Sequence, residues 1–593
     1  MKRPLTDEDI LERASIDGRV AFAMAAFAIG AGMVALLDRV GVPERIVGIL
    51  GPVLALSGLA LLGVLLHAVR VSRFYAAGRA VPAPYAGLAF VALTVGLVLP
   101  FLPPIPGEAP LRGMAAGLAC GFVLAALVTG PLLRKTGAFS LPDLIAGRFP
   151  NLNVRLSAVA VVSGVSLCAA LAGYELAIRI LEVALGTGRP LAALLSGLII
   201  LFVTIPGGMS GVVWGATGAA GILIAALALP LAIILAGGEA LPAPMLGDVE
   251  AWTAALKLIE GWQGGGNAVD ISGGGMLFFA VSLGIGSMAP LLAPAMTAHD
   301  SQSARTAGWT SLAWSALTLG IAACCMAVAA GVVDQWFTGE RADRLPEFAY
   351  RASAGDLLAI CGKSVADAEA ALAACKEAAG FSGLLLRPQE YVPRGLWLVL
   401  GMPALREFSA AFSGLAAAGL TAIALVLASA GFQSFGTALG HDAIYRVRES
   451  AARTSRRLAM TRIIIATAVI GLGGVLARYS LDPRQAVGLA IVLSAGAIAP
   501  LLALALWPRA SGNDAAIALL CGLGTAGAVI ALGGKTPDVQ TLANASVFAC
   551  GAAFAAGFAT SFLHSGGLAT EGSTFVQGVL HGETDLLNID KGA

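Results

Sequence analysis

Long apolar stretches limit how this chain can fold more than any other feature. Windows of about 20 residues, the length that crosses a bilayer as an α-helix, recur roughly fourteen times. Inside hydrocarbon, only helices and closed barrels satisfy every backbone hydrogen-bonding group. Hydrophobic residues make up 58% of the 593 residues and charged residues 12%, and the mean hydropathy is +0.84. The chain is therefore predicted to be an all-α polytopic protein whose first partner is the lipid bilayer.

The spans form a central block of ten, with one pair before it and another after it. The block divides into two groups of five, and its two long connections are expected to face outward. The predicted divisions are a tail over 1–18, two spans over 19–70, a first group over 84–236, a loop over 237–275, a second group over 276–507 that contains a loop over 334–405, and two spans with a cytoplasmic tail over 508–593.

Arginine and lysine collect in alternate connections, and this bias orients the chain. Cytoplasmic loops carry an excess of these residues, so that side is predicted to be cytoplasmic; an even number of spans places both termini there. Arg179, Arg189 and Arg484 are exceptions on the outer side. The residues that set the orientation are Arg70, Arg73, Arg79, Arg134, Lys135, Arg148, Arg155, Arg446, Arg448, Arg453, Arg456, Arg457 and Arg462.

Charge and the N-terminal segment narrow the setting further. The net charge of +1 provides no concentrated basic surface, which argues against a nucleic-acid partner. Residues 1–18 are rich in acids and lack a small-residue cleavage site, so we interpret them as a cytosolic tail. We expect an integral protein of a bacterial inner membrane.

The cysteines and the catalytic motifs point away from metal or cofactor chemistry. Cys361 and Cys375 lie in the outward loop, where a disulfide and two free thiols are alternative interpretations. The other six cysteines lie in apolar spans without metal-ligand spacing and are expected to pack as small side chains. Because we find no Ser-His-Asp arrangement and no phosphate loop, we expect neither an enzyme nor a cofactor.

Five segments on the predicted cytoplasmic connections resemble motifs of the sodium:solute symporter family, and most closely its acetate and monocarboxylate permease branch. Their order and spacing resemble the family over about residues 46–510. The segments are RFYAAGRAVP (73–82), LLRKTGAFSLPDLIAGRF (132–149), IPGGMSGVVW (205–214), TAHDSQSAR (297–305) and LGHDAIYR (439–446). The resemblance implies structural roles for Gly207, Gly208, Trp214, Asp300, Arg305, His441 and Asp442.

The resemblance also implies a leucine-transporter-like fold, in which two inverted five-helix repeats each begin with a helix broken at mid-membrane. The two groups of five spans agree with that plan. Gly284, Gly286 and Pro290 mark the expected break in the second repeat, and Gly96 and Pro100 stand at the corresponding place in the first. Such breaks expose backbone groups that suit a carboxylate substrate.

Several positions depart from the family pattern and weaken its sodium sites. Side chains that would supply oxygen atoms in the family are apolar here. Hard cations require oxygen ligands, so we expect transport to be independent of sodium. The candidate coupling ions are H⁺ and, less favoured, Na⁺, and the alternative to coupling is a uniporter. The departing residues are Ala86, Leu93, Ala170, Ala216, Ala219, Val426 and Leu427.

Polar groups inside the spans are costly to bury, which makes them candidates for a substrate or ion pathway. Glu175 is the strongest candidate, as a proton carrier, and the alternative is an ion pair with Arg179 one turn away. For a proton carrier, replacement of Glu175 by Gln should abolish pH-driven uptake in a folded protein. The pathway candidates are Thr94, Gly96, Tyr174, Glu175, Gly284, Gly286, Ser287, Ser429 and Gln433.

Together these features favour a secondary transporter for a small organic anion, a monocarboxylate such as acetate. The alternative is a non-transporting membrane module of the same fold that binds or regulates a small membrane partner protein. A central region filled by Leu93, Pro290 and Val426 would favour that alternative.

Overall fold

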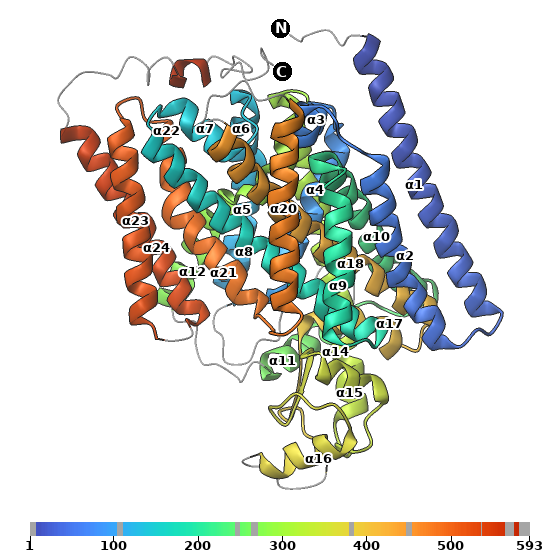
Figure 1. The fold of residues 1–593 in the computed structure, drawn as a ribbon. Helices are drawn as coiled ribbons and strands as arrows, with labels where there is room; N and C mark the ends of the chain where they lie inside the picture. The colour runs from blue at the N-terminus through green and yellow to red at the C-terminus, as the bar shows by residue number, and fades with distance from the viewer. Residues whose placement is uncertain are drawn as a thin grey trace.

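Membrane-length helices make up most of the protein. The computed structural model describes residues 7–102, 111–242, 249–262, 271–378, 385–445, 454–534, 537–563 and 575–579. Among these residues, twelve helices are long and apolar enough to cross a membrane. The bent pair α12 (Ile271–Gly286) and α13 (Ala289–Met296) and the shorter apolar helix α9 (Arg189–Thr204) bring the number close to the predicted fourteen. The protein is therefore an integral membrane protein, in which these helices stand side by side (Figure 1).

Two N-terminal helices lie beside the main bundle (Figure 1). α1 (Asp7–Arg39) packs along α2 (Glu44–Leu65), and only 17% of its membrane window is buried. α2 packs along α18 (Ala410–Thr437), where the two backbones touch. A side chain at Gly51 would lie 2.2 Å from the carbonyl oxygen of Gly414, so glycine is required for this approach.

Ten spans form two groups of five. The first group comprises α4 (Ala83–Val98), α5 (Leu111–Val123) continued through the π-helix η3 (Leu124–Thr129) into α6 (Gly130–Thr136), α8 (Leu152–Leu185), α9 and α10 (Gly208–Ala236). The second comprises α12–α13, α14 (Ser301–Phe337), α18, α20 (Thr454–Leu476), and α21 (Pro483–Leu493) continued through the π-helix η5 (Ser494–Ile498) into α22 (Ala499–Ala505). Two further helices, α23 (Gly512–Leu532) and α24 (Val539–Leu563), pack against each other.

The packing between the two groups is reciprocal. The first helix of each group packs on the second helix of the other, as α4 with α14 and α12 with α5. The third helices, α8 and α18, pack on each other, and each also receives the fifth helix of the other group. Such reciprocal packing is expected when a pseudo-two-fold axis in the membrane plane relates the two groups. Because each group has five spans, an odd number, the second group begins on the opposite side of the membrane and is inverted relative to the first. The predicted inverted repeats are thus present.

Among the described residues, only the second repeat begins with a broken helix. The predicted break is confirmed between Gly286 and Ala289, where the axis bends by 41°. The break predicted at Gly96 is wrong, because α4 stays helical through Val98. A side chain at Gly96 would lie 3.2 Å from Leu427 Cβ, so this glycine allows α18 to pack closely. Pro100 falls in the first turn of the short helix η2 (Leu99–Phe101), where it needs no N–H group.

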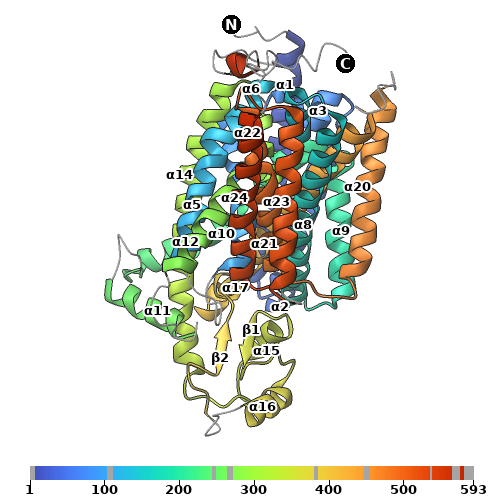
Figure 2. The same ribbon diagram turned by 90° about the vertical axis from the view of Figure 1, so that its left-hand side faces the viewer.

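The two ends of the bundle differ, and we name them by what they carry. The motif face carries α3 (Val71–Ala76), η1 (Ala77–Arg79), α7 (Leu141–Arg148) and the π-helix η4 (Ala438–Tyr445). The loop face carries α11 (Val249–Trp262), α15 (Glu347–Ala354), α16 (Ala368–Glu377) and α17 (Gly395–Leu405), with the antiparallel strands β1 (Leu358–Ile360) and β2 (Tyr391–Pro393) (Figure 2). Of the two alternatives for Cys361 and Cys375, the structure has the disulfide, with the Cα atoms 5.0 Å apart.

Candidate functional site

On the motif face, hydrogen bonds from arginine side chains connect segments that are distant in the sequence. Arg134, in the last turn of α6, donates from Nε to the carbonyl of Ala298 at 2.7 Å. Arg462 of α20 donates from Nε to the carbonyl of Ile205 at 2.8 Å and from Nη2 to that of Ala68 at 2.7 Å. These contacts bring together motif segments that the sequence placed on one side of the membrane. Arg446, Arg448 and Arg453, which also set the predicted orientation, lie outside the described residues.

A buried polar cluster lies among these segments, where His441 and Asp442 of η4 meet Asp143 of α7. One ligand atom from each of the three residues lies within 4.8 Å of the others. Ser140 donates to Asp442 Oδ2 at 2.6 Å, and His441 Nδ1 lies 3.0 Å from Asp442 Oδ1. The Tyr75 ring packs edge-on against His441 with centroids 5.0 Å apart. Nitrogen and carboxylate donors of this kind can hold a divalent cation, and the same groups can hold α7 and η4 together.

The other motif residues act in packing and capping. Gly208 has φ of +55°, and an added Cβ would lie 2.6 Å from the ring of Phe74, so only glycine fits there. Gly207 is the N-cap of α10, where an added Cβ would lie 2.7 Å from the carbonyl oxygen of Val203, and Trp214 is buried beside Tyr85. These positions fix how α10 leaves the motif face.

Asp300 is the N-cap of α14, and its carboxylate accepts the N–H of Ser303 at 2.6 Å. Burial by itself would raise the pKa of Asp300, but the hydrogen bonds from Ser303 and the nearby His299 outweigh it and hold the pKa below its usual value. Arg305 lies exposed one turn along the same helix. Asp300 thus caps the start of α14.

The polar residues predicted to line a pathway do not converge on one site. Ser429 donates to the carbonyl of Leu425 in its own helix at 2.8 Å. The others bond to neighbouring segments, and among them the Oε1 atom of Gln433 is buried without a hydrogen-bond partner. Thr94 lies 3.3 Å from Ser315, Ser287 lies 3.1 Å from Ser494, Tyr174 donates to the carbonyl of Ala193 at 2.9 Å, and Gln433 donates to that of Phe74 at 3.3 Å.

Close helix packing explains the predicted glycines around the break. A side chain at Gly284 would lie 2.6 Å from the Ile491 side chain, and one at Gly286 would lie 2.9 Å from Leu124 Cβ. The centre of the bundle is filled as well: Leu93 and Val426 are 1% and 0% exposed, and Pro290 is buried. The central helices are therefore in tight contact in this conformation.

Glu175 occupies the centre of a charged network toward the loop face. Its carboxylate is fully buried and pairs with Arg179 Nε at 3.0 Å and with the Nη2 group of Arg189. Arg179 also bonds Asp356 of the loop segment at 2.8 Å. Arg189 bonds the carbonyl of Leu476 at 2.7 Å. The ion pair that the sequence offered as one interpretation is present, extended by a second arginine.

Beside this network lies a cavity of about 230 Å³, which we call the vestibule. Its apolar wall includes Leu99, Pro100 and Leu176, and its charged groups are Arg179, Arg394, Arg484, Asp356 and Asp482. Asp482 caps α21 and pairs with Arg484 at 2.9 Å. Three guanidinium groups and two carboxylates line the vestibule, and the buried carboxylate of Glu175 pairs with Arg179 from behind the wall.

Sequence reasoning missed most of these residues. Arg484 had stood out only as an exception to the positive-inside bias, whereas Arg179 had stood out both as such an exception and as the possible partner of Glu175. Arg394 and Asp356 come from the long loop segment, whose position depends on contacts distant in sequence. Asp143 lies in a motif and follows Ser140 by three residues, a helix-start pattern that could have drawn attention to it.

The profile of the sodium:solute symporter family matches residues 74–338. An uncharacterized symporter of Cupriavidus necator is 28% identical over 148 residues, which span 23% of this chain and 21% of that protein. The solved structure of a Na⁺-coupled sialic acid symporter, substrate-bound and outward-open, is 15% identical with a TM-score of 0.60, over 88% of this chain and 98% of that one. The structure of a nucleobase-cation-symport-1 family transporter is 13% identical over 84% of this chain and 96% of that one, with a TM-score of 0.44. The leucine-transporter-like fold is confirmed by the likeness to the sialic acid symporter structure together with the reciprocal packing.

Proposed function

We propose that the protein is a secondary transporter that carries a small monocarboxylate, such as acetate, across a bacterial inner membrane. The observation that carries the proposal is the vestibule, which combines an excess of guanidinium groups with an apolar wall. Guanidinium groups bind carboxylates through paired, charge-assisted hydrogen bonds. An apolar wall suits the methyl group of the same molecule.

Size and charge together favour a small anion. The vestibule, at about 230 Å³, is smaller than the roughly 300–1,000 Å³ typical of pockets for drug-sized ligands. A carboxylate there would lie among Arg179, Arg394 and Arg484.

The orientation that we propose places the motif face and both termini in the cytoplasm. Arginines fasten segments on the motif face, and the Cys361–Cys375 disulfide lies at the loop face. Disulfides persist in oxidising compartments, which supports an external loop face. Because hydrogen bonds hold the motif segments together on the cytoplasmic side, the vestibule would receive solute from outside.

We propose a proton gradient, or the solute gradient alone, as the driving force. Leu93 and Val426 are buried apolar side chains at positions where the family resemblance implied sodium ligands. Apolar groups do not compensate a cation for its lost hydration. Sodium would therefore have only backbone carbonyls at those positions.

A second candidate function rests on the filled centre of the bundle. With Leu93, Pro290 and Val426 buried and the pathway candidates bonded to neighbours, the fold could serve as a non-transporting module that binds a small membrane partner. The exposed α1 would be available to such a partner.

Uptake by reconstituted protein separates the two functions. Proteoliposomes should accumulate labelled acetate, propionate or pyruvate under an imposed pH gradient, and protein-free liposomes provide the baseline. Absence of protein-dependent uptake for all three acids would reject transport of small monocarboxylates and favour the module.

A further inference from the structure

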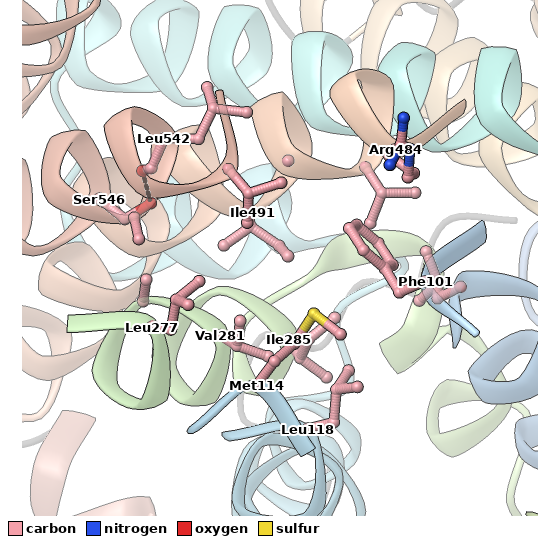
Figure 3. Close-up of a pocket in the computed structure, with 16 residues that line it drawn as sticks. Phe101, Met114, Leu118, Leu277, Val281, Ile285, Arg484, Ile491, Leu542 and Ser546 are labelled. Carbon is pink, nitrogen blue, oxygen red and sulfur yellow. Dashed lines mark hydrogen bonds between the residues drawn. The ribbon is translucent and has the colours of Figure 1, made fainter. Parts of the chain in front are cut away.

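A second cavity, distinct from the vestibule, lies between α5, α12, α21 and α24. We call it the crevice. Figure 3 shows Leu277, Val281 and Ile285 of α12 facing Ile491 and Leu542 across it, with Arg484 and Phe101 toward one end. Its lining is apolar apart from Arg484 and Ser546, and the Ser546 hydroxyl is satisfied by the carbonyl of Leu542 at 2.8 Å.

We propose that the crevice binds the alkyl tail of a medium-chain fatty acid whose carboxylate lies at Arg484. The free space is a narrow void of about 30 Å³. An apolar void offers water few hydrogen-bonding partners. This one is smaller than an alkyl tail, so its walls have to move apart to admit the tail. Methylene groups would restore the van der Waals contacts that the facing walls lack.

The charged end of the crevice selects the head group of the ligand. Arg484 lines both the crevice and the vestibule, so a head group at Arg484 reaches the polar cavity while its tail stays in the apolar one. Asp482 already pairs with Arg484, but a guanidinium has five N–H donors and can bind more than one carboxylate. Arg179 and Arg394 in the vestibule favour an anionic head group over a neutral or cationic one.

The walls can separate to admit a tail. Met114 and Leu118 of α5 have flexible side chains, and Ile285 directly precedes the bend between α12 and α13. A fatty acid in this position would occupy Arg484 and so compete with a small solute at the vestibule. Binding at the crevice itself does not require the protein to be a transporter.

Calorimetric titration of the full chain in nanodiscs tests the proposal, with empty nanodiscs subtracted for partition into lipid. We expect affinity to rise from butanoate through hexanoate to octanoate, by about fourfold for each added methylene. Octanol and octylammonium should bind more weakly than octanoate. Arg484→Gln should weaken octanoate about tenfold and leave octanol unchanged.

Two substitutions in the wall act in opposite directions. Val281→Phe fills the crevice and should remove the dependence on chain length, whereas Leu542→Ala enlarges it and should strengthen octanoate binding. Phe279→Leu, on the exposed side of the same α12, is the matched control and should bind octanoate like the wild type. If Val281→Phe fails to fold, Leu542→Ala still tests the site.

Equal octanoate affinity in the wild type and Leu542→Ala, or equal binding of octanoate and octylammonium, would overturn the proposal. These titrations are independent of the uptake assay. If acetate is not taken up but octanoate binding depends on chain length, the transport function is rejected and the fatty-acid site is retained. If acetate is taken up but binding does not depend on chain length, only the fatty-acid site is rejected.

Discussion

Arg179 lies one turn beyond Glu175 on α8, and its Nε donates to the buried carboxylate of Glu175 at 3.0 Å. Because Arg189 binds the same carboxylate from the start of α9, two guanidinium groups share this one buried acid. Those guanidinium groups also hold the carbonyls of Leu481 and Leu476 in the connection between α20 and α21. Glu175 thus supports the wall of the vestibule from behind.

We expect Glu175→Gln to lower the free energy of unfolding by about 3 kcal/mol, because two partly buried arginines lose their shared carboxylate. Thermal unfolding in detergent measures the loss. Glu182→Gln is the matched control: Glu182 is 22% exposed and lies 3.5 Å from Arg189, so its loss should cost under about 1 kcal/mol. A fully stable Glu175→Gln protein without pH-driven uptake would instead identify Glu175 as the proton carrier.

Uptake should proceed equally in sodium, potassium and choline salts. The reason is the apolar character of Leu93 and Val426, which offer a cation no oxygen. Initial rates of acetate uptake at equal ionic strength provide the measurement. A rate that saturates with millimolar sodium and disappears in potassium would contradict the prediction.

Arg394→Gln should raise the KM for acetate about tenfold with little change in kcat, since a charge-assisted hydrogen bond contributes roughly 1.5–3 kcal/mol. Arg351→Gln is the control, because Arg351 is 46% exposed on α15 and is not part of the vestibule lining. Uptake kinetics compare the two variants. An unchanged KM in Arg394→Gln would remove this arginine from the solute path.

Replacement of Cys361 and Cys375 by Ser should loosen the loop segment. A disulfide that closes a loop of 14 residues contributes about 3 kcal/mol by restricting the unfolded chain. Limited proteolysis should therefore cut the segment faster in the double variant, and a reductant should accelerate cleavage only in the wild type. Equal cleavage of both oxidised proteins would contradict this.

Asp300→Asn tests the pH dependence of the α14 cap. The folded pKa of Asp300 is lowered, so its charge adds stability that is complete above the unfolded value of about 3.9 and is lost as the pH falls through the folded value. Asn keeps the cap without the charge. The variant should be less stable than the wild type at neutral pH and equal to it in acid, whereas the exposed Asp17→Asn should show no such difference.

The helices and their grouping could be predicted because hydrophobic length is a local property of the chain. The motif residues could also be placed on one face, since each lies a few residues from a span end. Gly96 shows the limit of this reasoning. From the sequence, a glycine in a span can indicate either a helix break or a close contact between helices. For Gly96 the position of Leu427 on α18 shows that it is a close contact.

Most of the candidate site was beyond prediction for a related reason. The vestibule joins Arg179 of α8, Asp356 and Arg394 of the loop segment, and Arg484 of α21, which are far apart in sequence. Glu175 could be identified as a buried charge, and Arg179 as its neighbour by helical spacing. Arg189, which bonds the same carboxylate, depends on how α9 packs back against α8.

The arginine-to-carbonyl hydrogen bonds on the motif face have a consequence for evolution and for movement. Arg134 and Arg462 bind backbone oxygens of Ala298, Ile205 and Ala68, and every amino acid supplies that oxygen. The acceptor positions are therefore free to drift, whereas each arginine has to keep its guanidinium. In these three contacts the acceptor is a neutral carbonyl, which water can replace when the segments separate. Opening of the motif face at these three contacts therefore separates no ion pair.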